Sequence, residues 1–140
     1  MSTAANDQLT ANKTVVRRIY EEGYDQGDPK VFETLYAPGF EHHSKVIHDV
    51  APGGAGEAQS MRRFHEAIPD VRFEVGTQIA EGDFVATRLH ISGHPVGDYG
   101  PVRSSDDVFD VEALVLFRVE DGRVAEEWLY VDGGQGPAES

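Results

Sequence analysis

The spacing of apolar residues changes from a helical period to a strand period about halfway along the chain. In the first half they recur every three or four positions, as in the series Val15, Val16, Ile19, Tyr20, Tyr24. Thr10 can cap a first helix, which Gly27 ends, and Asp28-Pro29 suits the start of a second, which ends at Pro38-Gly39. We also predict an extended segment at residues 40–43, a loop at 44–56 and a third helix over 57–67.

In the second half of the chain the apolar residues alternate with polar ones, which is typical of strands with one buried face. Tight turns are expected at Glu81-Gly82-Asp83 and Glu120-Asp121-Gly122. The predicted strands cover residues 71–80, 84–92, 109–119 and 123–132, with a long connection at 93–107. Helices followed by an antiparallel sheet indicate a single α+β domain, in which helices cover one face of the sheet. A strongly curved sheet wrapped by three N-terminal helices would form a cone with an opening.

Length and composition agree with one globular domain. The chain has 140 residues, and we place the domain at residues 10–132, between a flexible N-terminus at 1–9 and a polar tail at 133–140. The N-terminus lacks the basic region followed by an apolar run that marks a signal peptide. No apolar run is long enough to cross a bilayer, so we expect a cytoplasmic protein without a membrane partner. The net charge of −13 disfavours nucleic acid, and the absence of Cys excludes disulfides and thiolate chemistry.

The stretch Asp83–His94 holds the first candidates for chemistry. Residues two apart on a strand share a face, so Arg88 and His90 point the same way. That face is either a solvated edge or the floor of a cavity. On a solvated face Arg88 would pair with a carboxylate and His90 would be an ordinary strand histidine. In a cavity Arg88 would orient a substrate oxygen and His90 would act as a general base near neutral pH.

The other histidines offer fewer possibilities. His42 and His43 are adjacent in an extended segment, so their side chains point to opposite sides and at most one reaches a cavity. We expect His48, His65 and His94 in loops or at the surface. The spacing of the histidines matches no established metal motif, so we expect no metal and no organic cofactor. The glycine-rich residues 53–56 could bind an anion, although a flexible hinge is the simpler interpretation.

Several short segments, in this order, are similar to a known family. They are Ile19–Asp28, Tyr36–His43, Ile68–Phe73, Ala80–Asp83, Phe117–Val124 and Glu127-Trp128. Together they resemble the SnoaL-like polyketide cyclase family of the nuclear-transport-factor-2-like superfamily, over roughly residues 12–132. The resemblance implies a cone-shaped fold with an apolar pocket, cofactor-free acid–base chemistry on a hydrophobic small molecule, and often a homodimer.

The resemblance also implies site residues, with two departures from the family pattern. Arg88, His90, and His42 or His43 fall at positions that line the pocket or react in relatives, and we name them as catalytic candidates. The acid/base positions of the founding cyclases are occupied here by Val115 and Leu129, which cannot transfer protons. The predicted substrate-binding residues are Tyr24, Val115, Phe117 and Leu129.

Two functions remain open at this point. The first is an enzyme that cyclises, isomerises or dehydrates an apolar substrate such as a polyketide, with its acid–base groups moved to Arg88, His90 and the His42-His43 pair. The second is a non-catalytic protein that binds an apolar small molecule. For either one we expect a homodimer, on the interpretation that Val85, Leu89 and Ile91 form an apolar outer face joined by Trp128 and Tyr130.

Overall fold

The computed structural model describes residues 3–47 and 50–132, so His48 and the predicted tail lie outside the described residues. The described residues contain three α-helices, one π-helix and five strands. In chain order these elements are α1 (Thr3–Arg18), η1 (Ile19–Asp25), α2 (Lys30–Thr34), β1 (Tyr36–Ser44), α3 (Gly53–Ala67), β2 (Arg72–Glu81), β3 (Phe84–Gly93), β4 (Phe109–Glu120) and β5 (Arg123–Asp132).

The five strands form one curved sheet in the order β1-β5-β4-β3-β2. Strands β2 to β5 pair antiparallel with one another, as expected, whereas β1 pairs parallel with β5. The segment at residues 40–43 is therefore part of a longer edge strand, and the sheet is mixed. Its partner in the sheet is the last strand of the chain, so nothing in the local sequence pattern indicates this pairing.

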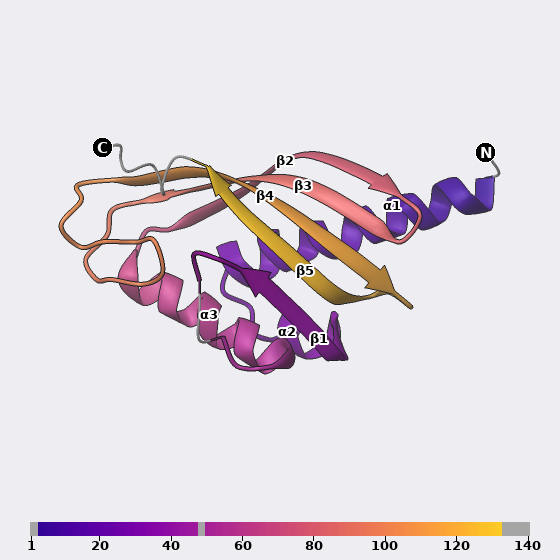
Figure 1. Ribbon diagram of the computed structural model, residues 1–140, viewed down its shortest axis with the longest axis horizontal. Coiled ribbons are helices and arrows are strands. Elements are labelled where there is room, and N and C mark those ends of the chain that lie inside the picture. The colour runs from indigo at the N-terminus through magenta and orange to yellow at the C-terminus, as the bar shows by residue number, and fades with distance from the viewer. Residues whose placement is uncertain (1–2, 48–49, 133–140) are drawn as a thin grey trace.

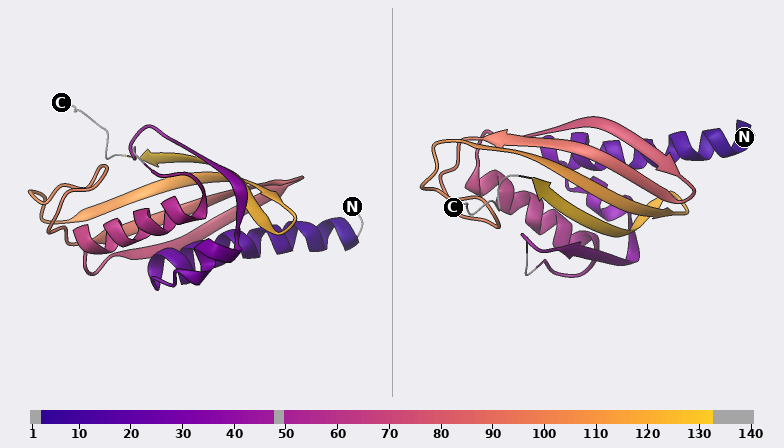
Figure 2. Two further views of the ribbon diagram at one scale, coloured as in Figure 1. Left: turned by 90° about the horizontal axis from the view of Figure 1, so that it is seen from below. Right: turned by 45° about the horizontal axis from the view of Figure 1, so that its top comes forward.

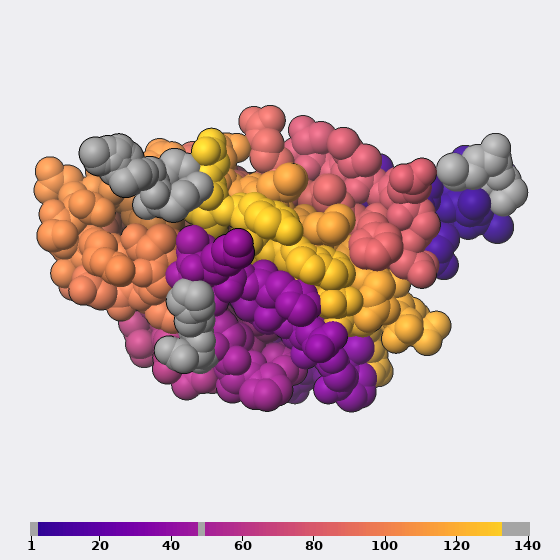
Figure 3. Space-filling view, in the orientation of Figure 1, coloured from indigo at the N-terminus to yellow at the C-terminus, as the bar shows by residue number. Residues whose placement is uncertain are grey.

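The helices lie on one face of the sheet and leave the other face uncovered (Figures 1 and 2). Helix α1 runs beneath β2 and β3 and projects past the end of the sheet, while α3 crosses under β1 and the sheet's other end. This arrangement confirms the predicted α+β cone with a single core between helices and sheet. Figure 3 shows β1 against β5 at the surface of the molecule.

The first predicted helix differs from the structure in where it begins and in its form. It begins at Thr3, inside the segment predicted to be flexible, and its last part is the π-helical η1. A π-helix often marks a functional site, because its wider turn changes which side chains face inward. Tyr20 and Tyr24 both lie on η1 and are buried. Gly27, two residues beyond the end of η1, adopts a positive φ of 77°, in agreement with the predicted end of the helix there.

The inward face of β3 is the apolar one. Val85, Leu89 and Ile91 are buried in the core with Phe117 and Val115 of β4, neither of which is exposed at all. The prediction that Val85, Leu89 and Ile91 form an outer apolar face is therefore wrong. Helices cover the concave side of this sheet, and burying these three side chains there removes them from water.

Glycines at the start of α3 allow it to pack closely on its neighbours. A Cβ atom on Gly54 would overlap the backbone oxygen of Phe32 in α2, and one on Gly56 would overlap that of Ala51. Residues 53–56 form the first turn of α3 rather than a separate loop. Gly54 and Gly56 thus allow close approach of the backbone to its neighbours.

Within the described residues, no helix combines the length and apolar character that crossing a membrane requires.

Candidate active site

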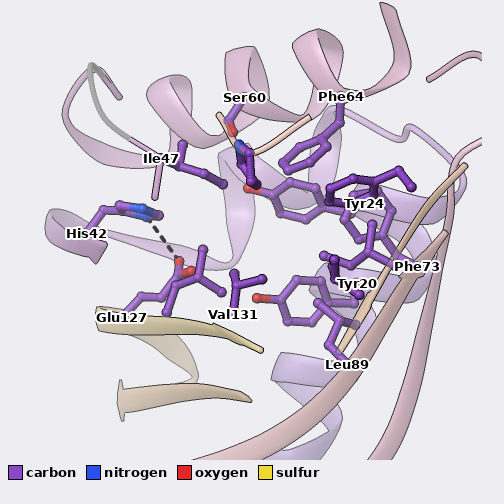
Figure 4. Close-up of a pocket in the computed structure, with 15 residues that line it drawn as sticks. Tyr20, Tyr24, His42, Ile47, Ser60, Phe64, Phe73, Leu89, Glu127 and Val131 are labelled. Atoms are coloured by element: carbon purple, nitrogen blue, oxygen red, sulfur yellow. Dashed lines mark ion pairs between the residues drawn. The ribbon is translucent and has the colours of Figure 1, made fainter. Parts of the chain in front are cut away.

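A cavity lies between the helices and the concave face of the sheet (Figure 4). Its volume is about 30 Å³, enough for roughly two water molecules. A larger molecule can therefore enter only if side chains or loops of the wall move. The lining is mostly aromatic and aliphatic and consists of Tyr20, Tyr24, His42, Ile47, Ser60, Phe64, Phe73, Leu89, Ile91, Pro101, Phe109, Val111, Glu127, Leu129 and Val131.

The polar end of the cavity is built by three elements that meet there. His42 of β1 and Glu127 of β5 are direct partners in the parallel strand pair, so their side chains lie on the same face. Glu57 reaches them from the first half of α3. Nδ1 of His42 lies 3.0 Å from Oε2 of Glu57 and 3.4 Å from Oε1 of Glu127. We call these three residues the His-Glu-Glu cluster.

Polar atoms of this cluster lack hydrogen-bond partners although they are buried. Glu57 is 1% exposed, and the Tyr24 hydroxyl donates a hydrogen bond of 2.7 Å to its Oε1. Within residues 3–47 and 50–132, neither Glu57 Oε2, nor the two ring nitrogens of His42, nor the Tyr36 hydroxyl has a hydrogen-bond partner. The close His42 contacts are thus ion pairs without hydrogen-bond geometry. Buried polar atoms without partners are uncommon and are a mark of functional sites.

Burial and charge shift the proton affinities of the cluster strongly. Burial lowers the pKa of His42, but the adjacent carboxyl groups of Glu127 and Glu57 outweigh this effect and raise it to about 10. Burial and the nearby Glu57 raise the pKa of Glu127 to about 7, against the opposing effect of His42. Glu127 can therefore gain or lose a proton near neutral pH, which a general acid or base requires.

Tyrosine hydroxyls surround the cluster and stay protonated. Burial raises the pKa values of Tyr20, Tyr24 and Tyr36 well above 10, and the carboxyl groups of Glu57 and Glu127 add to this shift. Tyr20 and Tyr24 pack ring against ring with centroids 5.4 Å apart, and Tyr24 also contacts Phe73 at 5.1 Å. These rings form an apolar wall of the cavity beside the cluster.

His42 also faces the outside. A surface groove of about 580 Å³, formed by residues 40–44, 47 and 50–53, shares His42 and Ile47 with the cavity. The side chain of His42 is 12% exposed, although both of its ring nitrogens are buried. The Tyr99 and Ser60 hydroxyl oxygens lie 2.6 Å apart and link the β3–β4 connection to α3.

The cluster also has the donor atoms of a cation site. One nitrogen of His42 and one oxygen each from Glu57 and Glu127 lie within 4.8 Å of one another, as do donor atoms of Glu41, His43 and Glu126 at the surface. A single imidazole with two carboxylates differs from the two-histidine set of the common facial triad.

Two predicted catalytic residues, Arg88 and His90, lie on the face of the sheet that points away from the cavity. Arg88 and His90 do share a face of β3, but it is the uncovered outer face of the sheet. Arg88 is paired with Glu112 at 2.9 Å, and His90 with Asp110 at 2.8 Å and Glu74 at 3.3 Å. Hydrogen bonding to Asp110 raises the pKa of His90 despite partial burial. The prediction that they floor the cavity is wrong, because the apolar side of β3 takes the buried face.

The other predicted residues divide between cavity and core. His42 faces the cavity, whereas His43 points outward, where it pairs with Glu126 at 2.8 Å and stacks on Trp128 at 5.3 Å. Tyr24 and Leu129 line the cavity as predicted. Val115 and Phe117 are not among its lining residues, since both are fully enclosed in the core between sheet and helices.

Sequence reasoning missed Glu57, Glu127 and Tyr20. Glu127 lies two residues before Leu129, so placing Leu129 toward a pocket also places Glu127 there. Glu57 precedes Met61 and Phe64 at helical spacing and therefore shares their buried face. The strand spacing of Glu127 and the helical spacing of Glu57 could therefore have indicated burial. A glutamate is usually solvated, however, so its position on an apolar face is easily overlooked.

The chain is similar to proteins of one known family in both sequence and fold. A model of the SnoaL-like polyketide cyclase family matches residues 14–135. Among solved structures, a candidate SnoaL-like polyketide cyclase from Jannaschia sp. CCS1 is 26% identical with a TM-score of 0.73, over 89% of this chain and 87% of that one. IdmH, a candidate polyketide cyclase from Streptomyces antibioticus, is 24% identical with a TM-score of 0.69, over 86% and 91%. No curated protein matches the chain.

Proposed function

The chain belongs to the SnoaL-like polyketide cyclase family, and from this premise we propose that it is an enzyme that moves protons on an apolar small molecule. Cyclisation, isomerisation and dehydration all begin with removal of a proton from a carbon next to a carbonyl group. The observation that carries the proposal is the buried His-Glu-Glu cluster at the end of an otherwise apolar cavity. Titratable groups perturbed by burial and by a specific partner are typical of catalytic sites.

In the proposed mechanism Glu127 is the general base. Its carboxylate takes the proton from the substrate carbon, and the electron pair of the broken C–H bond forms an enolate. The free Nε2 of protonated His42 donates a hydrogen bond to the enolate oxygen and stabilises the new charge. Glu127 then returns its proton to the product. Tyr24 holds Glu57, which keeps His42 protonated and raises the proton affinity of Glu127.

The experiment that tests this proposal measures proton removal directly. Benzylacetone is an apolar ketone whose α protons exchange with deuterium oxide when a base removes them, and NMR follows the exchange. We expect the protein to accelerate exchange, and Glu127→Gln to reduce the acceleration by about 10²–10⁴-fold, the usual contribution of a general base. His42→Gln should also reduce it, because it removes the charged donor.

Matched variants on the other face of the sheet serve as controls. Glu126→Gln changes the neighbouring carboxyl group of the same strand, and Arg88→Ala and His90→Ala remove the outward-facing pair. All three should exchange at the wild-type rate. Exchange no faster than in buffer would favour a non-catalytic binder of apolar molecules. A fully active Glu127→Gln protein would show that Glu127 is not the base.

We propose that this chemistry needs no metal or organic cofactor. The base, the acid and the oxygen-binding donor are all supplied by Glu127 and His42. Dialysis against EDTA should therefore leave benzylacetone exchange unchanged. Loss of exchange that one divalent metal restores would instead assign the His-Glu-Glu cluster to metal binding.

We also propose that the protein forms a homodimer through the outer face of the sheet. Phe84, Leu114 and Tyr130 are exposed there, and Leu116 and Trp128 lie beside them as a strand pair. We call these five residues the outer apolar patch. A two-fold interface pairs a surface with itself, and an apolar centre avoids the like-charge repulsion expected of a chain with net charge −13.

A further inference from the structure

Tyr24 is held at two ends by side chains of the same helix. Its hydroxyl donates a hydrogen bond of 2.7 Å to Oε1 of Glu57, in the first half of α3. Its backbone carbonyl oxygen lies 2.6 Å from Nε2 of His65, in the last turn of α3. A carbonyl oxygen only accepts hydrogen bonds, so Nε2 of His65 carries a proton and donates it. Glu57 and His65 are eight positions apart, which is about two turns of a helix.

The Tyr24 carbonyl needs this side-chain donor because the backbone offers it none. A helix carbonyl usually accepts from an N–H group four or five residues later. The N–H groups of residues 27 and 28 bond to carbonyls that precede Tyr24, namely Gly27 to Gly23 and Asp28 to Glu22. Residue 29, five positions after Tyr24, is Pro and has no N–H group. Among the described residues, the donor to this carbonyl is therefore the His65 ring.

Packing of the Tyr24 ring does not by itself define where its hydroxyl lies. The ring contacts Phe32 and Phe73, with centroid distances of 5.3 and 5.1 Å. Apolar contacts of this kind are less directional than hydrogen bonds, so they enclose the ring without defining its position along its long axis. The hydrogen bonds at the two ends of Tyr24, to His65 and to Glu57, define that position.

From this geometry we propose that His65 is a positioning residue for the His-Glu-Glu cluster, because it holds the Tyr24 backbone where the hydroxyl reaches Glu57. His65 lines a surface groove and not the described cavity, so it acts on the cluster through Tyr24. A Glu57 carboxyl held in this way stays 3.0 Å from Nδ1 of His42. The raised pKa values of His42 and Glu127 both depend on that carboxyl group. As a statement about catalysis, the proposal rests on the proposed function, but the positioning is measured without catalysis.

The first experiment follows the Tyr24 hydroxyl by NMR with no substrate present. The protein is labelled with carbon-13 at the tyrosine ring carbon that bears the hydroxyl, and the signal absent from Tyr24→Phe is that of Tyr24. Glu57→Gln gives the signal position for a weaker bond, because a neutral oxygen replaces a charged one. We expect His65→Asn to move the signal toward that position. His65→Gln should keep the wild-type position, since its longer amide can donate from the place of Nε2.

The contrast between the two amides separates the hydrogen bond from packing. An unmoved signal in His65→Asn, or a signal moved equally in both amide variants, would overturn the proposal. His94→Asn is the control, because that side chain is 71% exposed and pairs with Asp70, and its Tyr24 signal should match the wild type. Circular dichroism checks folding. If His65→Asn does not fold, His65→Leu, which also lacks a donor, takes its place, and a moved signal in His65→Gln still contradicts the proposal.

The second experiment measures the consequence for benzylacetone exchange. We expect His65→Asn to slow exchange by up to about 10²-fold, since a small displacement caused far from the reacting atoms can have an effect of that size. His65→Gln should restore most of the rate. In a Tyr24→Phe background, His65→Asn should have no further effect, because the hydroxyl through which it acts is already absent. A further loss of the same size would show that His65 acts by another route.

The two proposals can fail independently. If His65→Asn moves the Tyr24 signal but the wild type does not catalyse benzylacetone exchange, the role of His65 stands and the enzyme assignment falls. If the wild type and His65→Asn catalyse exchange equally well, the enzyme assignment stands and the role of His65 in catalysis is wrong.

Discussion

At the scale of single residues, the properties of Glu127 follow from its surroundings more than from its chemical type. The residue is 4% exposed and its carboxyl group lies near Glu57, so the ionised form loses hydration and meets a second carboxyl group. One position earlier, Glu126 is on the outer face, and hydrogen bonding to His43 lowers its pKa. Adjacent glutamates of one strand thus have opposite pKa shifts because a strand alternates its faces.

These shifts predict how stability depends on pH. The pKa of Glu127 is raised from 4.5 to about 7, so its stabilising contribution is complete below about 4.5 and is lost as the pH rises through 7. The pKa of His42 is raised from 6.5 to about 10, so its contribution is lost between those values. We expect the free energy of unfolding from these groups to fall as the pH rises from 5 toward 10.

Urea denaturation at a series of pH values measures this trend, with Glu127→Gln compared against Glu126→Gln. The first variant should flatten the decline between pH 5 and pH 7, and the second should not. Glu57, Tyr20, Tyr24 and Tyr36 face the pair, while His43 acts on Glu127 through its charge from the outer face. The pKa values of the three tyrosines lie above this range. A decline of equal slope in both variants would show that the charge of Glu127 is not its source.

At the scale of elements, the position of α3 controls the cluster because this helix carries Glu57. The first turn of α3 lies so close to its neighbours that Gly54 and Gly56 have no room for a side chain. Gly56 precedes Glu57 directly, so a displaced first turn would move the carboxyl group away from His42. The close packing of α3 and the geometry of the cluster are therefore linked.

Gly56→Ala should destabilise the protein although alanine is the better helix former. Its Cβ would overlap the Ala51 carbonyl, and such overpacking costs about 1–3 kcal/mol in the free energy of unfolding. Gly39→Ala is the matched control, because no atom lies within 4 Å of the Cβ position there. Urea denaturation of both variants measures the difference. A Gly56→Ala protein as stable as the control would show that the helix can shift without cost.

At the scale of the whole molecule, the two faces of the sheet have different uses. The concave face packs against the helices and contains the cavity, whereas the convex face is uncovered (Figure 2). Charged pairs such as Arg88–Glu112 lie on that convex face with the outer apolar patch. Exposed apolar residues gathered on one uncovered face are typical of an interface.

The proposed dimer predicts the effect of a charge in the outer apolar patch. Leu114 is 51% exposed, so Leu114→Asp should leave the monomer folded but place like charges together across a two-fold interface. Light scattering at micromolar concentrations should show a dimer for the wild type and a monomer for this variant. Val96→Asp, at a position 67% exposed in the β3–β4 connection, is the control and should remain dimeric. A monomeric wild type would remove the proposal.

Much of the fold can be predicted from the sequence, because short-range patterns determine it. Helical spacing around Val16 and Tyr20, the turns at Gly82 and Gly122, and the alternation along β3 to β5 each depend on residues close together in the chain. These patterns correctly indicate helices followed by a sheet. The parallel pairing of β1 with β5 joins residues such as His42 and Glu127, which are 85 positions apart, so no local pattern indicates it.

The sequence by itself determined the α+β architecture, the alternation of faces along each strand and the chemical groups available. Only the tertiary structure decided which face was buried and which groups met. Alternation pairs Arg88 with His90 on one face but does not say which side the helices cover, so both lie outside. Likewise His42, Glu57 and Glu127 come from three elements distant in the chain. Their cluster exists because the parallel pairing of β1 with β5 and the close packing of α3 place them together.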